Sequence, residues 1–121
     1  MVSSAFCLYL LLAAVSYVHC VELTQTDSIV LKPGEVLTLS CKISGYSVTD
    51  GSYWTHWIRQ AAGKALEWIG QIGANGYTNY NDKLNSRFIL TKHTSSNTET
   101  LSGQNMQTED TAVYYCARER Y

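Results

Sequence analysis

Apolar and polar residues alternate along two segments of the chain, the pattern of strands that bury one face. In residues 35–44, four residues share an apolar face: Leu37, Leu39, Cys41 and Ile43. Residues 111–117 repeat the alternation, with Ala112, Tyr114 and Cys116 on one face. Because each apolar face carries one cysteine, we expect the two strands to lie in two facing sheets, with both cysteines in the core between them.

Turn motifs separate further strand-like segments. A Pro-Gly pair at residues 33–34 precedes the first strand, and residues 61–65 separate two apolar runs. Asn-Gly at residues 75–76 lies between two strand-like runs and indicates a hairpin. Residues 93–98 form a polar turn, and the only helix-like segment is a short turn at residues 106–110. Short strands with frequent turns predict an all-β sandwich or barrel.

The first twenty residues differ from the rest of the chain. They contain no charged side chain, and residues 5–15 are almost wholly apolar. This run is short for a bilayer span, so we interpret residues 1–20 as a signal peptide cleaved after Cys20. The alternative is a buried helix. Residues 21–121 then form one domain, secreted or on the extracellular face of the plasma membrane, and that segment makes no membrane contact of its own.

Charge and cysteine content narrow the class of protein. The net charge of −1 argues against nucleic acid or an anionic membrane as a partner. Removal of the leader leaves two of the four cysteines, Cys41 and Cys116. In an oxidising compartment such a pair predicts a disulfide, and no further Cys or His is spaced for a metal site.

We find no sequence signature of an enzyme. After the leader the histidines are His56 and His93, and neither lies in a nucleophile motif. No glycine-rich phosphate loop is present. We therefore predict no catalytic residue, no cofactor and no metal.

The positions of the two cysteines, one tryptophan and one tyrosine indicate a particular fold far more specifically than the alternation alone. Cys41 is followed by Trp57, and Tyr114 stands two residues before Cys116. This arrangement resembles an immunoglobulin V-type domain, a two-sheet Greek-key sandwich. Residues 57–70 and 78–88 resemble an antibody heavy-chain variable region. The other V-type possibility is a receptor or adhesion domain such as a T-cell receptor chain.

The resemblance implies roles for core and charged residues. Trp57 would pack on the Cys41–Cys116 bridge, and the hydroxyl of Tyr114 would bond back to the preceding backbone. Leu39 and Phe88 would belong to the same core. Four charged residues would form structural ion pairs at the edge of the sandwich: Arg59, Glu67, Arg87 and Asp110.

The resemblance also implies two binding surfaces. One sheet face would meet a light-chain variable domain through Ile58, Gln60, Leu66, Trp68 and Tyr115. Single-domain heavy chains often carry a polar residue in place of Leu66, and the apolar side chain here favours pairing. Three loops, at residues 46–56, 71–79 and 117–121, would bind antigen. The residues expected to contact antigen are Asp50, Ser52, Tyr53, Trp54, Asn75, Tyr77, Asn79 and Glu119.

Two departures from the family pattern concern the end of the sandwich and its core. No Trp-Gly-x-Gly motif follows Cys116, so we expect a sandwich that lacks its last strand and is C-terminally incomplete. Gly103 stands where the family has a large apolar residue, and we expect the glycine either to leave a void or to draw the two sheets together. Glu99 also stands at an inward position, where it either pairs with Lys92 or turns out to solvent.

Overall fold

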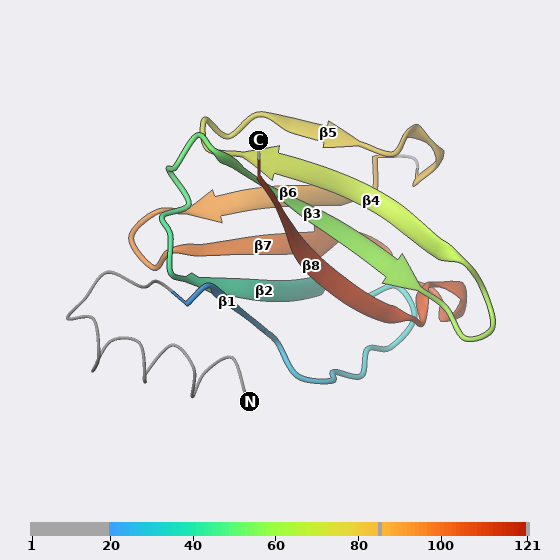
Figure 1. The fold of residues 1–121 in the computed structure, drawn as a ribbon. Coiled ribbons are helices and arrows are strands. Elements are labelled where there is room, and N and C mark those ends of the chain that lie inside the picture. Colours follow the sequence, from blue (N-terminus) through green and yellow to red (C-terminus); the bar gives the residue numbers. More distant parts are fainter. Residues whose placement is uncertain (1–19, 85, 121) are drawn as a thin grey trace.

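Two four-stranded antiparallel sheets pack face to face in the computed structural model, which describes residues 20–84 and 86–120 (Figure 1). The strand order is β1-β2-β7-β6 in one sheet and β5-β4-β3-β8 in the other. The strands are β1 Glu22–Gln25, β2 Leu37–Ser44, β3 Tyr53–Gln60, β4 Leu66–Gly73, β5 Thr78–Tyr80, β6 Phe88–His93, β7 Thr98–Gly103 and β8 Val113–Arg120. The predicted all-β sandwich is confirmed, whereas residues 1–19 of the expected signal peptide lie outside the described residues.

Strand pairing joins segments that are far apart in sequence. β2 pairs with β7, so that Cys41 lies opposite Glu99. β3 pairs with β8, so that Trp57 lies opposite Cys116. Along β2 buried and more exposed residues alternate over its whole length, because only one face of this sheet packs on the other sheet.

The core forms around the predicted disulfide. Cys41 and Cys116 are bonded across the two sheets, with their Cα atoms 6.4 Å apart. Trp57 is fully buried and belongs to the same cluster as both cysteines, Leu39 and Phe88. The bridge links residues 75 positions apart, and restricting the unfolded chain in this way stabilises the fold by about 4 kcal/mol.

The core has no void at Gly103, so the first of the two alternatives was wrong. A Cβ atom built on Gly103 would lie 2.9 Å from the sulfur of Met106 and 2.9 Å from Cε1 of Phe88. These two buried side chains occupy the space that a larger residue at position 103 would need. The glycine is therefore matched to its neighbours and does not leave a cavity.

Two short 3₁₀ turns complete the chain: η1 Asp82–Leu84 and η2 Thr108–Asp110. η2 brings Asp110 beneath β8, where the hydroxyl of Tyr114 donates a hydrogen bond to the carbonyl oxygen of Asp110 at 2.7 Å. Among the residues that the structure describes, no helix is long and apolar enough to cross a membrane.

Candidate functional site

Three segments meet at one end of the sandwich, on the left of Figure 1. They are the connection from β2 to β3, the turn between β4 and β5, and the end of β8. The rigid sheets below set the positions of these segments, which is how loop-based binding surfaces are usually built.

The β2–β3 connection, residues 45–52, is held from below by Asn97 in the β6–β7 turn. The side-chain amide of Asn97 donates to the carbonyl oxygens of Ile43 and Tyr46, both at 2.8 Å, and its oxygen accepts from the N–H of Val48 at 2.8 Å. Sequence reasoning missed this role of Asn97. Its positive φ of 51° is the signature of a turn residue, which the polar turn at residues 93–98 had indicated.

Two aromatic rings and an arginine also pack together at the β2–β3 connection. The rings of Tyr46 and Tyr53 lie 4.3 Å apart, and the guanidinium of Arg118 lies 5.5 Å and 4.8 Å from their respective centres. The carboxylate of Asp50 accepts a hydrogen bond from the N–H of Ser52 at 2.9 Å. Asp50 and Ser52 are exposed, whereas Tyr53 is half-buried.

The turn between β4 and β5 comprises residues 74–77. The N–H of Gly76 donates to the carbonyl of Gly73 at 3.0 Å, and the N–H of Gly73 donates to the carbonyl of Tyr77 at 2.9 Å. Gly76 has a φ of 80°, as in a type I turn followed by a left-handed residue. Asn75, Tyr77 and Asn79 are exposed, and Tyr77 shows 70% of its surface.

Lys92 of β6 supports this hairpin from the neighbouring sheet. Its ammonium group donates to the carbonyl oxygen of Ala74. The second loop is therefore fixed by a side chain that lies eighteen residues further along the chain.

Four of the residues expected to contact antigen from loops lie in strands: Tyr53 and Trp54 in β3, Asn79 in β5 and Glu119 in β8. Trp54 belongs to β3, and its ring packs 3.1 Å from the position that a Cβ atom on Gly73 would take. Glu119 belongs to β8, pairs with Trp54 in the strand register, and accepts a hydrogen bond from Nε2 of His56 at 2.7 Å. Residues 117–120 thus extend the sheet and do not form the start of a loop, because β3 offers them a pairing edge up to Tyr53.

A buried carboxyl group lies beneath the loops. Glu99 is 2% exposed, so the expectation that it turns out to solvent was wrong. Its Oε1 atom has no hydrogen-bond partner among the described residues. Lys92 lies opposite Glu99 in the strand register, but its ammonium group donates to Ala74 instead. Burial raises the pKa of Glu99, against which a hydrogen bond from Thr55 and the charge of Lys92 act in the lowering direction.

The outer face of the β5-β4-β3-β8 sheet exposes apolar side chains. Leu66 is 62% exposed and Tyr115 is 41% exposed, while Ile58 and Trp68 are half-buried beside them. Gln60 is exposed, and its amide donates to the carbonyl of Lys64.

A hydrogen-bond chain connects this face with the end of β8. The indole N–H of Trp68 donates to Nδ1 of His56 at 3.0 Å. Since Nδ1 is then the acceptor, the proton of the neutral imidazole lies on Nε2, which donates to Glu119. The orientation of Trp68 on the outer face is thereby coupled to the β8 end of the loop surface.

At the opposite end of the sandwich, the charged residues form a connected cluster. Arg87 donates to both carboxylate oxygens of Asp110, at 2.9 Å and 2.7 Å. Arg59 donates to Asp110 at 2.9 Å and to Glu67 at 2.7 Å. The hydrogen bonds from Arg87 hold the pKa of Asp110 well below its usual range. Each charged group of this cluster is therefore paired with another member of the cluster, which offsets the cost of burying it.

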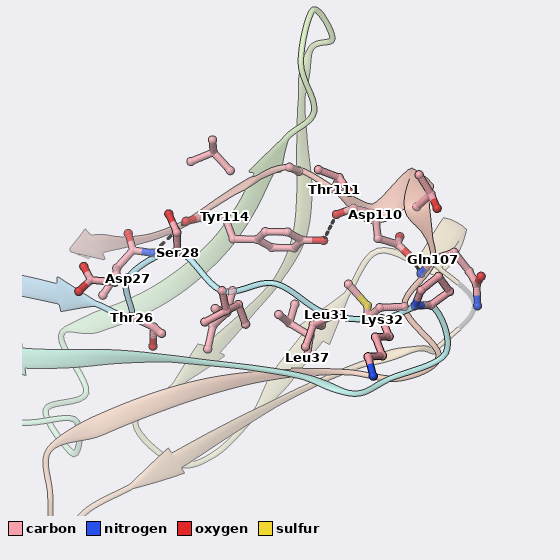
Figure 2. Close-up of a pocket in the computed structure, with 18 residues that line it drawn as sticks. Thr26, Asp27, Ser28, Leu31, Lys32, Leu37, Gln107, Asp110, Thr111 and Tyr114 are labelled. Carbon is pink, nitrogen blue, oxygen red and sulfur yellow. Dashed lines mark hydrogen bonds between the residues drawn. The ribbon is translucent and has the colours of Figure 1, made fainter.

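A groove of about 500 Å³ lies between the segment that follows β1 and residues 106–114, which include the first two residues of β8 (Figure 2). Leu31, Leu37 and the ring of Tyr114 line it. β8 is an edge strand, and the side chain of Gln25 binds part of its outer backbone: its amide donates to the carbonyl of Tyr114 at 2.9 Å, and its oxygen accepts from the N–H of Cys116 at 3.2 Å.

The described residues offer no group of three or more His, Cys, Asp or Glu side chains that could hold a metal ion.

The chain is similar to known proteins at the level of a family and of a single relative. The immunoglobulin V-set domain family matches residues 24–121. The chain is 43% identical over 110 residues to the Ig heavy chain V region MOPC 315 of Mus musculus, a match that covers 91% of this chain and 80% of the mouse protein.

Proposed function

Because the chain belongs to the immunoglobulin V-set family, we propose that it binds antigen as the variable domain of an antibody heavy chain, paired with a light-chain variable domain. It serves adaptive humoral immunity as a secreted protein or at the extracellular face of the plasma membrane. Neither binding step involves catalysis or a cofactor.

The observation that carries this proposal is the exposed apolar face of the β5-β4-β3-β8 sheet. Leu66, Tyr115 and the half-buried Trp68 share a surface that faces solvent in the isolated chain. Exposed apolar side chains gathered on one sheet face mark protein interfaces, and aromatic residues dominate the energetics of such contacts. Ile58 and Gln60 lie on the same face and belong to the proposed interface.

The antigen surface comprises the end of the sandwich next to this face. Asp50, Ser52, Asn75 and Tyr77 are supported as contact residues by their exposure in the loops, and Asn79 by its exposure in β5. Tyrosine and asparagine suit such a role, because tyrosine offers contact area at low entropic cost and asparagine offers adaptable hydrogen bonds. Trp54 and Glu119 act at the base of the surface, where their strand positions limit their reach.

We propose that a further strand binds in the groove beside the start of β8. An extended segment placed there would pair with the outer edge of β8 and cover Leu31 and Tyr114. Gln25 already supplies hydrogen bonds to that edge at Tyr114 and Cys116. The connection from the end of β8 to this further strand would form the third antigen-binding loop, beyond residue 120.

A T-cell receptor chain or another V-type receptor remains the second candidate, since the fold alone is shared among many functions. The similarity to the mouse heavy-chain V region supports the antibody assignment over it.

Pairing distinguishes the two candidates. We would titrate the purified domain with light-chain variable domains and, in parallel, with T-cell receptor variable domains, and measure heterodimer formation by analytical ultracentrifugation. Heterodimers with the light-chain domains alone are expected. Pairing only with the T-cell receptor domains, or with neither, would overturn the proposal.

A further inference from the structure

The second loop contains a chemically reactive sequence. Of the six asparagines in the chain, only Asn75 is followed by glycine. The amide nitrogen after an asparagine can attack the side-chain carbonyl carbon and close a five-membered ring. A glycine at that place removes the side chain that would otherwise hinder the attack.

The structure leaves this Asn-Gly pair open to solvent. Asn75 and Gly76 are both exposed at the tip of the β4–β5 hairpin, and a Cβ atom built on Gly76 would meet no atom within 4 Å. No hydrogen bond of the Asn75 side-chain amide is found among the described residues. The side chain is therefore free to rotate toward the nitrogen of Gly76.

One contact acts against the reaction. The N–H of Gly76 donates to the carbonyl of Gly73 at 3.0 Å, so this turn must open before the nitrogen can attack. A single exposed hydrogen bond in a hairpin tip is a weak restraint. We expect it to slow the reaction only roughly two- to tenfold relative to an unstructured peptide.

Other asparagines serve as internal comparisons, because hydrogen bonds restrain their amides. The amide of Asn97 donates to two carbonyl oxygens and accepts from Val48. The amide of Asn81 donates to the carbonyl of Trp68, and its oxygen accepts from the N–H of Lys83. Threonine follows Asn97 and aspartate follows Asn81, so both sites are also more hindered.

We propose that Asn75 is a site of spontaneous deamidation with water as the co-reactant. The nitrogen of Gly76 forms a bond to Cγ of Asn75, and the side-chain nitrogen leaves as ammonia after taking up the proton from the Gly76 amide. Water then opens the cyclic imide. Cleavage next to the side-chain carbonyl gives aspartate, and cleavage next to the backbone carbonyl gives isoaspartate, so the balance is asparagine plus water to an acid plus ammonia.

The product changes the loop in two ways. Residues 69–81 carry no charged side chain, so the new carboxylate is the first charge in the second loop. Isoaspartate also lengthens the backbone by one carbon within a short hairpin turn that is closed by the hydrogen bond between Gly73 and Tyr77. The effect of these changes on antigen binding rests on the proposed function, whereas the reaction itself does not.

The test is a time course on the folded, purified chain at mildly alkaline pH, with proteolytic peptides separated and weighed by mass spectrometry. We expect amide loss with both acid products in the peptide that contains Asn75, and intact peptides for Asn81 and Asn97. Asn75→Gln should abolish the modification, because glutamine would have to form a larger ring. The unfolded chain should react faster at Asn75 by the two- to tenfold factor.

Faster or equal amide loss at Asn81 or Asn97 in the folded chain would overturn the proposal, as would an Asn75 peptide that stays unmodified while the unfolded chain reacts. Circular dichroism of Asn75→Gln, expected to match the unmodified chain, verifies that the variant is folded. These outcomes do not depend on light-chain pairing, so failure here is distinguishable from failure of the proposed function.

Discussion

At the scale of single residues, Glu99 and Asp110 show how surroundings decide the behaviour of a buried carboxyl group. Both are almost completely buried, at 2% and 7% exposure. Two arginines neutralise Asp110, which lowers its pKa, whereas desolvation dominates at Glu99 and raises its pKa. The two acids therefore make the stability of the fold depend on pH in opposite directions.

Replacement of Glu99 by valine should stabilise the domain at neutral pH. The folded-state pKa of Glu99 is raised, so folding is most favourable below the ordinary glutamate pKa and loses stability as the pH rises through the raised value. Glu99→Val removes this loss together with the unsatisfied Oε1 atom, and the free energy of unfolding should rise by about 1–3 kcal/mol. Urea unfolding across the pH range measures the effect. Glu99→Gln, which cannot ionise, should lose the same pH dependence. A less stable valine variant would show that the carboxylate has a required partner.

Replacement of Asp110 by alanine should have the opposite result. Its pKa is lowered by Arg87, so its contribution is present above the ordinary aspartate pKa and disappears as the pH falls. Asp110→Ala leaves Arg87 and Arg59 without their shared acceptor and should lower the free energy of unfolding by about 3–5 kcal/mol at neutral pH. This decrease in the free energy of unfolding should become smaller at acidic pH. Glu109→Gln, at an exposed neighbouring acid, serves as the control and should change little. Equal effects of the two substitutions would contradict the assigned role of Asp110.

At the scale of elements, sequence patterns predicted strands well where burial follows the strand period. β2 and the first half of β8 alternate clearly, and the Asn-Gly pair marked the β4–β5 hairpin. Residues 117–120 were assigned to a loop, because their local pattern carries no strand signal and only pairing with β3 orders them.

The other structural features that the sequence did not predict also depend on contacts between distant segments. The sequence shows glycine at position 103 but not that Met106 and Phe88 fill the space above it. The sequence also does not show that Asn97 supports the first loop or that Lys92 supports the second. Both contacts depend on where the β6–β7 hairpin lies in the folded chain. Propensity and periodicity are local, so they do not contain this information.

The open edge of β8 gives a prediction for this element. An antibody joining segment appended after Tyr121 should pair with β8 and fill the adjacent groove. Each additional kcal/mol of stability raises the melting temperature of a domain of this size by about 4–8 °C, and we expect a rise of at least that amount. A Gly-Ser segment of equal length is the control. Equal melting temperatures for the two proteins would contradict the proposed strand site.

At the scale of the whole molecule, two surfaces meet along one sheet. The outer face of β5-β4-β3-β8 carries Leu66, Trp68 and Tyr115, and the loops lie at the end of the same sheet. The Trp68–His56–Glu119 hydrogen bonds run from one surface to the other. The proposed light-chain interface and the proposed antigen surface are therefore joined by a chain of hydrogen bonds.

The dissociation constant of the complex with a light-chain variable domain tests the central claim most directly. The chain offers a matched pair of substitutions: Leu66→Glu on the proposed interface, and Ile89→Glu on the outer face of the other sheet, where the isoleucine is 50% exposed. We predict that the unmodified domain binds, that Leu66→Glu weakens binding by about tenfold or more, and that Ile89→Glu leaves it unchanged. No binding by the unmodified domain, or an equal loss in both variants, would contradict the account.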